Sequence, residues 1–213
     1  MKSTKQRSLI ICILISLVLL AGIILLIPKT KPANAEAIES NDKLNFTQIT
    51  SEDGESSYKV AVKPAYRSTV EFIVVPETYN GLAVTEVAAN GFVSCAKLTK
   101  VILPETVRVL GINAFMNCAK LKFVSMPCVE SIGTNAFGMC MALDRLFIPE
   151  TVMEVGSNIL RNNSNTVYVQ SSVEVIDIMW SSTWSNYFTG EIMYSVDPQD
   201  TIQYREVLAT DNK

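Results

Sequence analysis

The chain has 213 residues, of which 48% are hydrophobic and 18% are charged, and its formal net charge is −3. It contains no histidine, which excludes Ser-His-Asp and Cys-His catalysis and the H-E-x-x-H zinc motif. No G-x-x-x-x-G-K-[ST] phosphate loop and no C-x-x-C pair occur in the sequence. We therefore expect a protein that is not an enzyme and that uses no cofactor and no metal.

The first 35 residues differ in composition from the rest of the chain. Basic residues near the N-terminus precede an uncharged apolar run over residues 9–27. At a rise of about 1.5 Å per residue, this run nearly spans the ~30 Å apolar core of a bilayer, which favours a retained membrane anchor. Pro28 and the small-x-small sequence at residues 33–35 instead favour a signal peptide that is cleaved after Ala35. Both interpretations export the remainder of the chain.

The charge of the chain follows the same division. All five charged residues of the export segment are basic, so 13 basic and 21 acidic residues remain in the exported part, a net charge of −8. An acidic domain argues against nucleic acid or an anionic membrane surface as the main partner. We expect contact with a membrane through residues 1–35 only, and a location at the cell surface or outside the cell.

Residues 36–57 are rich in Glu, Ser, Asp and Asn and contain few large apolar side chains. Such a composition cannot bury enough apolar surface to offset the entropy lost on folding. It therefore predicts a flexible spacer between the export segment and the domain that follows.

A block of about 22 residues then recurs. Full copies cover 84–106, 107–128 and 129–151, and a degenerate copy covers 152–170. Phe92, Phe115 and Phe137 occupy equivalent positions in the three full copies. A period of 20 to 50 residues is typical of stacked supersecondary units. We predict a repeat solenoid over residues 58–170.

Each copy contains one predicted strand. In residues 98–103 the first, fourth and sixth side chains are apolar, and the alternation at the end of this stretch predicts a short strand with one buried face. Pro104 ends the strand because proline cannot donate to a sheet. The same pattern precedes Pro76, Pro127 and Pro149. Stacked copies would pair these strands in parallel.

A turn is predicted between successive strands. The sequence Gly111-Ile112-Asn113-Ala114-Phe115 returns as Gly133-Thr134-Asn135-Ala136-Phe137. Glycine permits a positive φ, and an asparagine side chain can hydrogen-bond its own backbone two residues on. We expect the glycine to adopt the positive φ of this turn, and the phenylalanine that follows to be buried.

These motifs resemble a known family. The pattern V-x-x-I-G-x-N-A-F-x-x-C-x-x-L-x-x-V-x-I-P-E-T is similar to the BspA-like leucine-rich repeats of bacterial surface proteins, over residues 58–170. Residues 172–187 are similar to the closing segment of that family. The resemblance implies a leucine-rich-repeat-like, β-rich right-handed coil with short parallel strands, turns and short helical segments. It also implies binding or adhesion at the cell surface, and it supplies no catalytic residue.

Three cysteines are equivalent in the repeats. Stacking would align Cys95, Cys118 and Cys140 about 4.8 Å apart, with parallel side-chain directions that suit a disulfide poorly. We predict that they are small buried apolar residues. Cys128 lies off this line at a shortened turn, and we predict that it is the most exposed and reactive of the four.

The outward side chains of the predicted strands combine aromatic and basic residues. They form the candidate partner-binding face: Phe72, Lys100, Ile102, Phe123, Ser125, Arg145 and Phe147. Aromatic residues and arginine are enriched at protein interfaces and their hot spots, so the composition predicts a face that binds a protein or a glycan. The alternative is that another segment of the chain covers it.

Residues 171–196 are apolar and aromatic, and we expect them to cap the last coil. A carbohydrate platform made of Trp180, Trp184 and Tyr187 is the alternative. Residues 197–213 form a polar tail. The whole sequence indicates an exported, surface-associated recognition protein, and the alternative function is a structural or self-associating cell-envelope scaffold without a foreign ligand.

Overall fold

The computed structural model describes residues 40–143, 145–164, 166–171, 176 and 179–194. The expected export segment and the expected polar tail therefore lie outside the described residues. Among the residues that are described, no helix is both long enough and apolar enough to cross a membrane.

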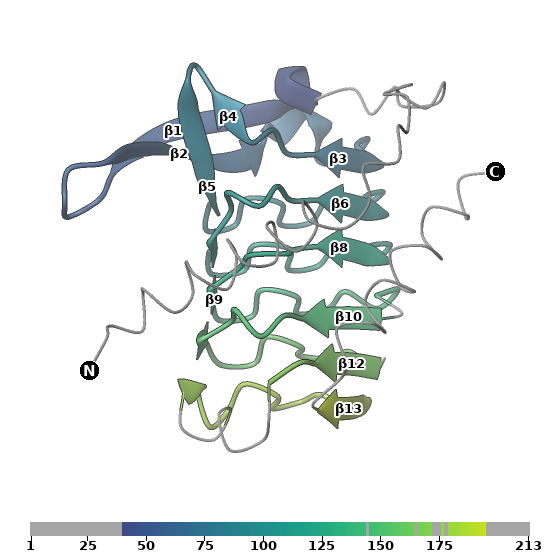
Figure 1. The fold of residues 1–213 in the computed structure, drawn as a ribbon. Coiled ribbons are helices and arrows are strands. Elements are labelled where there is room, and N and C mark those ends of the chain that lie inside the picture. Colours follow the sequence, from purple (N-terminus) through teal and green to yellow (C-terminus); the bar gives the residue numbers. More distant parts are fainter. Residues whose placement is uncertain (1–39, 144, 165, 172–175, 177–178, 195–213) are drawn as a thin grey trace, which may run out of the picture. The chain divides into compact units, whose positions relative to one another are not determined.

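The chain coils into a β-solenoid of about six turns, and one line of parallel strands runs down one side of the stack (Figure 1). This line consists of two three-stranded sheets, in the orders β3-β6-β8 and β10-β12-β13. Their bounds are β3 Phe72–Val74, β6 Lys100–Ile102, β8 Phe123–Ser125, β10 Arg145–Ile148, β12 Thr166–Val169 and β13 Glu191–Tyr194. We call their outward surface the β3–β13 face.

A second sheet runs along another side of the coils, in the order β1-β2-β5-β7-β9-β11. Its strands are β1 Leu44–Thr50, β2 Ser56–Val62, β5 Leu82–Val87, β7 Val109–Leu110, β9 Ser131–Ile132 and β11 Glu154–Val155. The short strand β4 Thr78–Tyr79 pairs with β5, and the 3-10 helices η1 Ser40–Lys43 and η2 Pro64–Tyr66 flank the β1–β2 hairpin. The repeat pattern did not predict this sheet, because most coils contribute only two residues to it.

The turn segments form a third line of hydrogen bonds between coils. The backbone N–H groups of Phe92 and Phe115 donate to the carbonyl oxygens of Ala114 and Ala136, at 2.8 Å in both cases. Asn90 and Ser94, two residues before and after Phe92, donate in the same way to the carbonyl oxygens of Ile112 and Met116. Every second amide of the turn therefore points to the next coil. The backbone is therefore satisfied on three sides of the stack, as buried polar groups require.

The predicted core is confirmed. The inward side chains of the strands, among them Leu98, Val101 and Leu103, are all buried. The rings of Phe92, Phe115 and Phe137 stack in a column, with ring centroids 5.1 and 5.4 Å apart. Each coil thus buries its apolar side chains against the coils above and below it, which a single unit cannot do.

The conformational role predicted for the turn glycines is wrong. Positive φ values occur instead at the asparagines, such as Asn113 at 55° and Asn135 at 55°, whereas Gly111 and Gly133 have none. A Cβ on Gly133 would lie 2.6 Å from the backbone nitrogen of Ile112 in the preceding coil. Glycine is needed here because two backbones come too close together for any side chain.

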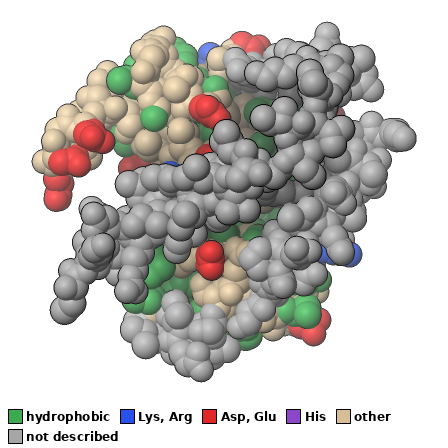
Figure 2. All heavy atoms as spheres, viewed as in Figure 1, with side chains coloured by type: hydrophobic (Ala, Val, Ile, Leu, Met, Phe, Trp, Pro, Cys, Tyr) green, Lys and Arg blue, Asp and Glu red, His purple; other side chains and the backbone are tan. Residues whose placement is uncertain are grey.

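Residues 44–57, expected to be part of a flexible spacer, instead form β1 and the start of β2, an antiparallel hairpin. Leu44, Val60 and Val62 are buried against the first coil. A hairpin with one buried face needs only a few apolar residues. For this reason the polar composition of residues 36–57 wrongly predicted a flexible spacer. The ring of Phe46 stacks on that of Tyr79 at 4.0 Å, and acidic side chains gather at the far end of the hairpin (Figure 2).

The segment expected to be a C-terminal cap continues the coil. Its strand β13 pairs in parallel with β12. Trp180 and Trp184 are only 6% and 7% exposed and contact each other edge to face, and the indole N–H of Trp180 donates to the Val152 carbonyl at 3.4 Å. Buried indoles cannot stack on a sugar, so the structure contradicts the carbohydrate platform.

Substitution of Gly133 tests the close-approach explanation. Gly133→Ala should destabilise the fold by about 1–3 kcal/mol, because the new methyl group overpacks a rigid backbone contact. Gly133→Asn should be at least as harmful, although asparagine tolerates a positive φ. Denaturant unfolding of the full chain, followed by circular dichroism, measures both. A Gly133→Asn variant as stable as wild type would contradict the explanation.

Candidate partner-binding face

The strand register arranges the outward side chains in two rows. In the first row Phe72 lies opposite Lys100, and Lys100 lies opposite Phe123. In the second row Ile102 lies between Val74 and Ser125, which it faces across the two strand pairs. Five residues of the candidate face on β3, β6 and β8 are thus brought together as the repeat phase predicted.

Lys100 contacts both aromatic rings of the first row. Its ammonium nitrogen lies 5.6 Å from the centroid of the Phe72 ring and 6.0 Å from that of Phe123. Each such cation–π contact contributes about 0.5–1 kcal/mol at an exposed site. Phe123 is only 8% exposed, so its ring offers a partner little surface, and the half-exposed residues around it present most of the apolar area.

The remaining candidate residues lie on the second sheet of the same face. Arg145 and Phe147 lie on β10, where Phe147 pairs with Tyr168 of β12. Tyr168 in turn pairs with Met193 of β13, which is 44% exposed. Sequence reasoning omitted Tyr168 and Met193 because it treated their segments as a degenerate repeat and a cap. The alternation of Thr166–Val169 was the available signal.

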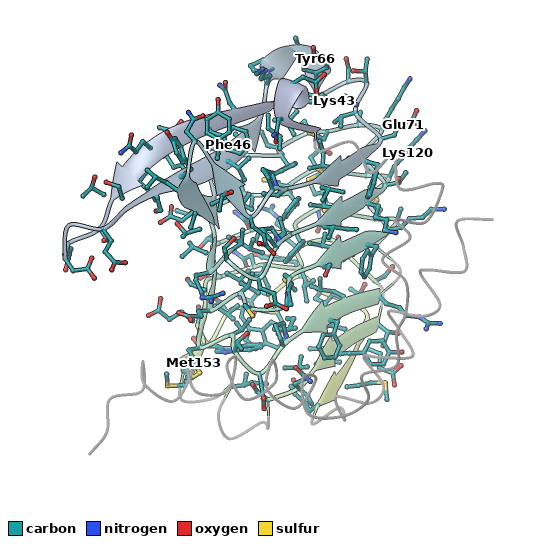
Figure 3. All side chains as sticks on the ribbon, turned by 45° about the horizontal axis from the view of Figure 1, so that its top comes forward. Lys43, Phe46, Tyr66, Glu71, Lys120 and Met153 are labelled. Carbon is teal, nitrogen blue, oxygen red and sulfur yellow. The ribbon has the colours of Figure 1, made fainter. Side chains whose placement is uncertain are left out.

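Lysines border this face where its strands begin. Lys97, Lys120 and Lys122 are exposed, and Figure 3 shows Lys120 on that side of the stack together with Glu71. None of these lysines forms an ion pair within the part of the chain that the structure describes. The face therefore carries local positive charge on a chain whose net charge is −3.

The described residues contain no group of three or more His, Cys, Asp or Glu side chains that could hold a metal ion. Glu77, Glu105 and Glu150 follow the strand-ending prolines and are exposed. They lie on separate coils, as a recurring feature of the repeat would.

The three equivalent cysteines are buried free thiols, as predicted. The thiol of Cys118 donates to the Phe92 carbonyl at 2.9 Å, and that of Cys140 donates to the Phe115 carbonyl at 3.0 Å. Burial raises the pKa of Cys140 to about 12. A hydrogen bond between the Cys95 and Cys118 thiols lowers the pKa of Cys95 and raises the pKa of Cys118.

Cys128 is the most exposed of the four cysteines, as predicted, because the other three are fully buried, but it is itself buried. This residue is 8% exposed, and its carbonyl accepts a hydrogen bond from the Arg108 guanidinium at 3.2 Å. Its neighbour Val129 is fully buried. The shortened turn is therefore held against the preceding coil, which explains why Cys128 is buried.

A family model described as the BspA type leucine rich repeat region matches residues 70–187, in six copies. The chain belongs to this family. The match extends to residue 187, beyond the degenerate copy at residues 152–170, in agreement with the coil that residues 179–194 complete.

Two solved structures share the fold of this leucine-rich repeat chain. A leucine rich cell surface protein from Faecalibacterium prausnitzii is 21% identical with a TM-score of 0.53, over 74% of this chain and 40% of that one. A leucine-rich repeat protein from Bacteroides ovatus is 23% identical with a TM-score of 0.52, over 73% and 40%. This chain thus spans less than half of either relative. No curated protein matches it.

The buried thiols should resist alkylation. In the folded chain at pH 8, Cys95, Cys118 and Cys140 should react with iodoacetamide at least tenfold more slowly than in denaturant, because burial blocks the reagent and the pKa of Cys140 lies far above this pH. Mass spectrometry of labelled peptides measures the rates. Labelling of Cys118 at the same rate in both states would contradict its burial.

Proposed function

We propose that this leucine-rich repeat protein is exported and binds a protein or glycan partner through its β3–β13 face, in recognition or adhesion at the cell surface. The observation that carries the proposal is a band of partly exposed apolar side chains on β3, β6, β10 and β12. It consists of Phe72, Val74, Ile102, Phe147 and Tyr168. Contiguous exposed apolar surface is a mark of interaction sites.

The energetics of a stacked sheet suit such a face. Backbone pairing on both sides of β6 and β12 holds their outward side chains in place, so a partner loses little entropy in ordering them. Burial contributes about 25 cal/mol for each Å² of apolar surface removed from water. Aromatic anchors surrounded by such surface are typical hot spots.

The bordering lysines suggest the character of the partner. Lys97, Lys120 and Lys122 have no ion pair among the described residues, so acidic groups of a partner can reach them without breaking existing contacts. Charges at the rim of an interface act mainly on the association rate, and salt screens them. A partner with an acidic margin around an apolar centre fits this arrangement.

The export part of the proposal rests on the apolar run at residues 9–27. A retained anchor would keep the repeats at the membrane surface, and cleavage after Ala35 would release them. The intact mass of the mature protein distinguishes the two, because cleavage leaves Glu36 as the first residue.

Charged substitutions in the apolar band test the binding proposal. Ile102→Lys and Phe147→Lys should each reduce capture of extracted cell-surface components by the immobilised full chain at least tenfold, because an ammonium group would be buried in the apolar centre. The matched control is Ser131→Lys, at a half-exposed site on β9 of the other sheet, which should capture as wild type does.

Circular dichroism should show that all three variants remain folded. Digestion of the extract with a protease or with glycosidases, before capture, separates a protein partner from a glycan. Capture that is equal for wild type, Ile102→Lys and Phe147→Lys would rule out this face as the binding surface.

A further inference from the structure

Strand β1 forms one edge of the β1–β11 sheet. The Lys63 N–H donates to the Lys43 carbonyl, and the Ser51 N–H donates to the Glu55 carbonyl, both at 2.9 Å. The odd-numbered residues of β1 therefore direct their backbone groups toward β2, and antiparallel pairing directs those of the even-numbered residues outward. The residues whose backbone N–H and C=O groups point outward, away from β2, are Leu44, Phe46, Gln48 and Thr50. Their outward groups have no backbone partner among the described residues.

This edge lacks the features that usually block strand pairing. Edge strands are commonly short, charged, interrupted by proline or bulged. The sequence of β1 is LNFTQIT, seven residues without charge or proline, and its register with β2 is continuous. At the opposite edge of the same sheet, β11 has only two residues, one of them Glu154, and the Val155 carbonyl accepts a hydrogen bond from Ser181.

We propose that β1 pairs with β1 of a second copy of this chain, in antiparallel orientation about a two-fold axis at Thr47. An antiparallel pair of identical strands is self-complementary, as a two-fold interface requires. With the axis at Thr47, Leu44 pairs with Thr50 of the other copy, and Phe46 pairs with Gln48. All four outward residues then find partners, and the two sheets become one.

The charges at the two ends of β1 favour this orientation. Lys43 immediately precedes the strand, and the exposed loop that follows it contains Glu52, Asp53 and Glu55. Antiparallel pairing places the Lys43 of each copy beside the acidic loop of the other, twice by symmetry. Parallel pairing would place the two acidic loops side by side, where like charges repel.

The pairing joins the solenoids at their N-terminal ends. It uses no residue of the β3–β13 face, so the inference does not rest on the proposed function. One seven-residue strand per copy makes an interface smaller than the ~1,200 Å² of a typical stable complex, and dimer formation should depend on concentration. Each dimer would carry two copies of the β3–β13 face, which raises avidity for a multivalent surface.

Cysteine cross-linking of the full chain in detergent micelles tests the register. In a Cys12→Ser background, cysteine is placed singly at Asn45, Thr47 or Ile49. Thr47 would face its own copy in a non-hydrogen-bonded pair at about 4.5 Å between Cα atoms, within the range that a disulfide spans. Residue 45 or 49 would lie roughly 13 Å from its own copy. Disulfide dimers should form at position 47 at least tenfold more than at 45 or 49.

Edge substitutions in the Thr47→Cys chain provide the controls. Gln48→Pro removes an outward donor and leaves the hydrogen bonds to β2 intact, so it should reduce cross-linking at least tenfold, whereas Gln48→Ala should preserve it. Lys43→Glu should weaken cross-linking, and a second change, Glu52→Lys, should restore it. Circular dichroism should be unchanged throughout.

Two results would overturn the inference. Equal cross-linking at positions 45, 47 and 49 would indicate random collisions within the micelle. Absence of dimer at position 47, in variants that remain folded, would show that β1 does not pair.

Discussion

The distance between neighbouring coils is the constraint on which the rest of this structure depends. Each coil must place its backbone within hydrogen-bonding distance of the next on three sides at once: the β3–β13 strands, the β5–β11 strands and the turns. Side chains in the interior then lie about one strand spacing apart. That spacing suits a column of stacked phenylalanines and buried thiols, and it excludes any Cβ at the turn glycines.

The repeat phase was sufficient to predict the inward and outward sides of the strands, because burial alternates there with a period of two. It could not predict why Gly133 is glycine. Residue identity alone does not distinguish a positive φ from a close backbone approach, since both exclude other side chains. Asn135 supplies the positive φ here, and only the position of the preceding coil shows that Gly133 meets its backbone.

Two errors, the flexible spacer predicted over residues 44–57 and the exposure predicted for Cys128, share a physical cause. The β1–β2 hairpin and the turn at Cys128 are stabilised by contacts with coils distant in sequence, such as the hydrogen bond from Arg108 to the Cys128 carbonyl. The composition of a short segment does not reveal contacts with residues that are distant in the sequence. The pairing of the outward residues was predicted correctly on β3, β6 and β8, where the pattern is regular. The predicted face omitted Tyr168 on β12 and Met193 on β13. In these two strands the coil continues, but the sequence no longer follows the repeat consensus.

Regular stacking also separates the two kinds of surface on this molecule. Inward positions are nearly uniform because every coil fills the same space, whereas outward positions such as Phe72, Lys100 and Phe123 are released from that requirement and differ from coil to coil. Specificity for a partner can therefore reside only in the outward residues. Unpaired backbone, in contrast, occurs at an end of the stack, where β1 pairs with β2 on one side only. A solenoid that binds a partner along its side can for this reason join a second copy at its end, without competition between the two contacts.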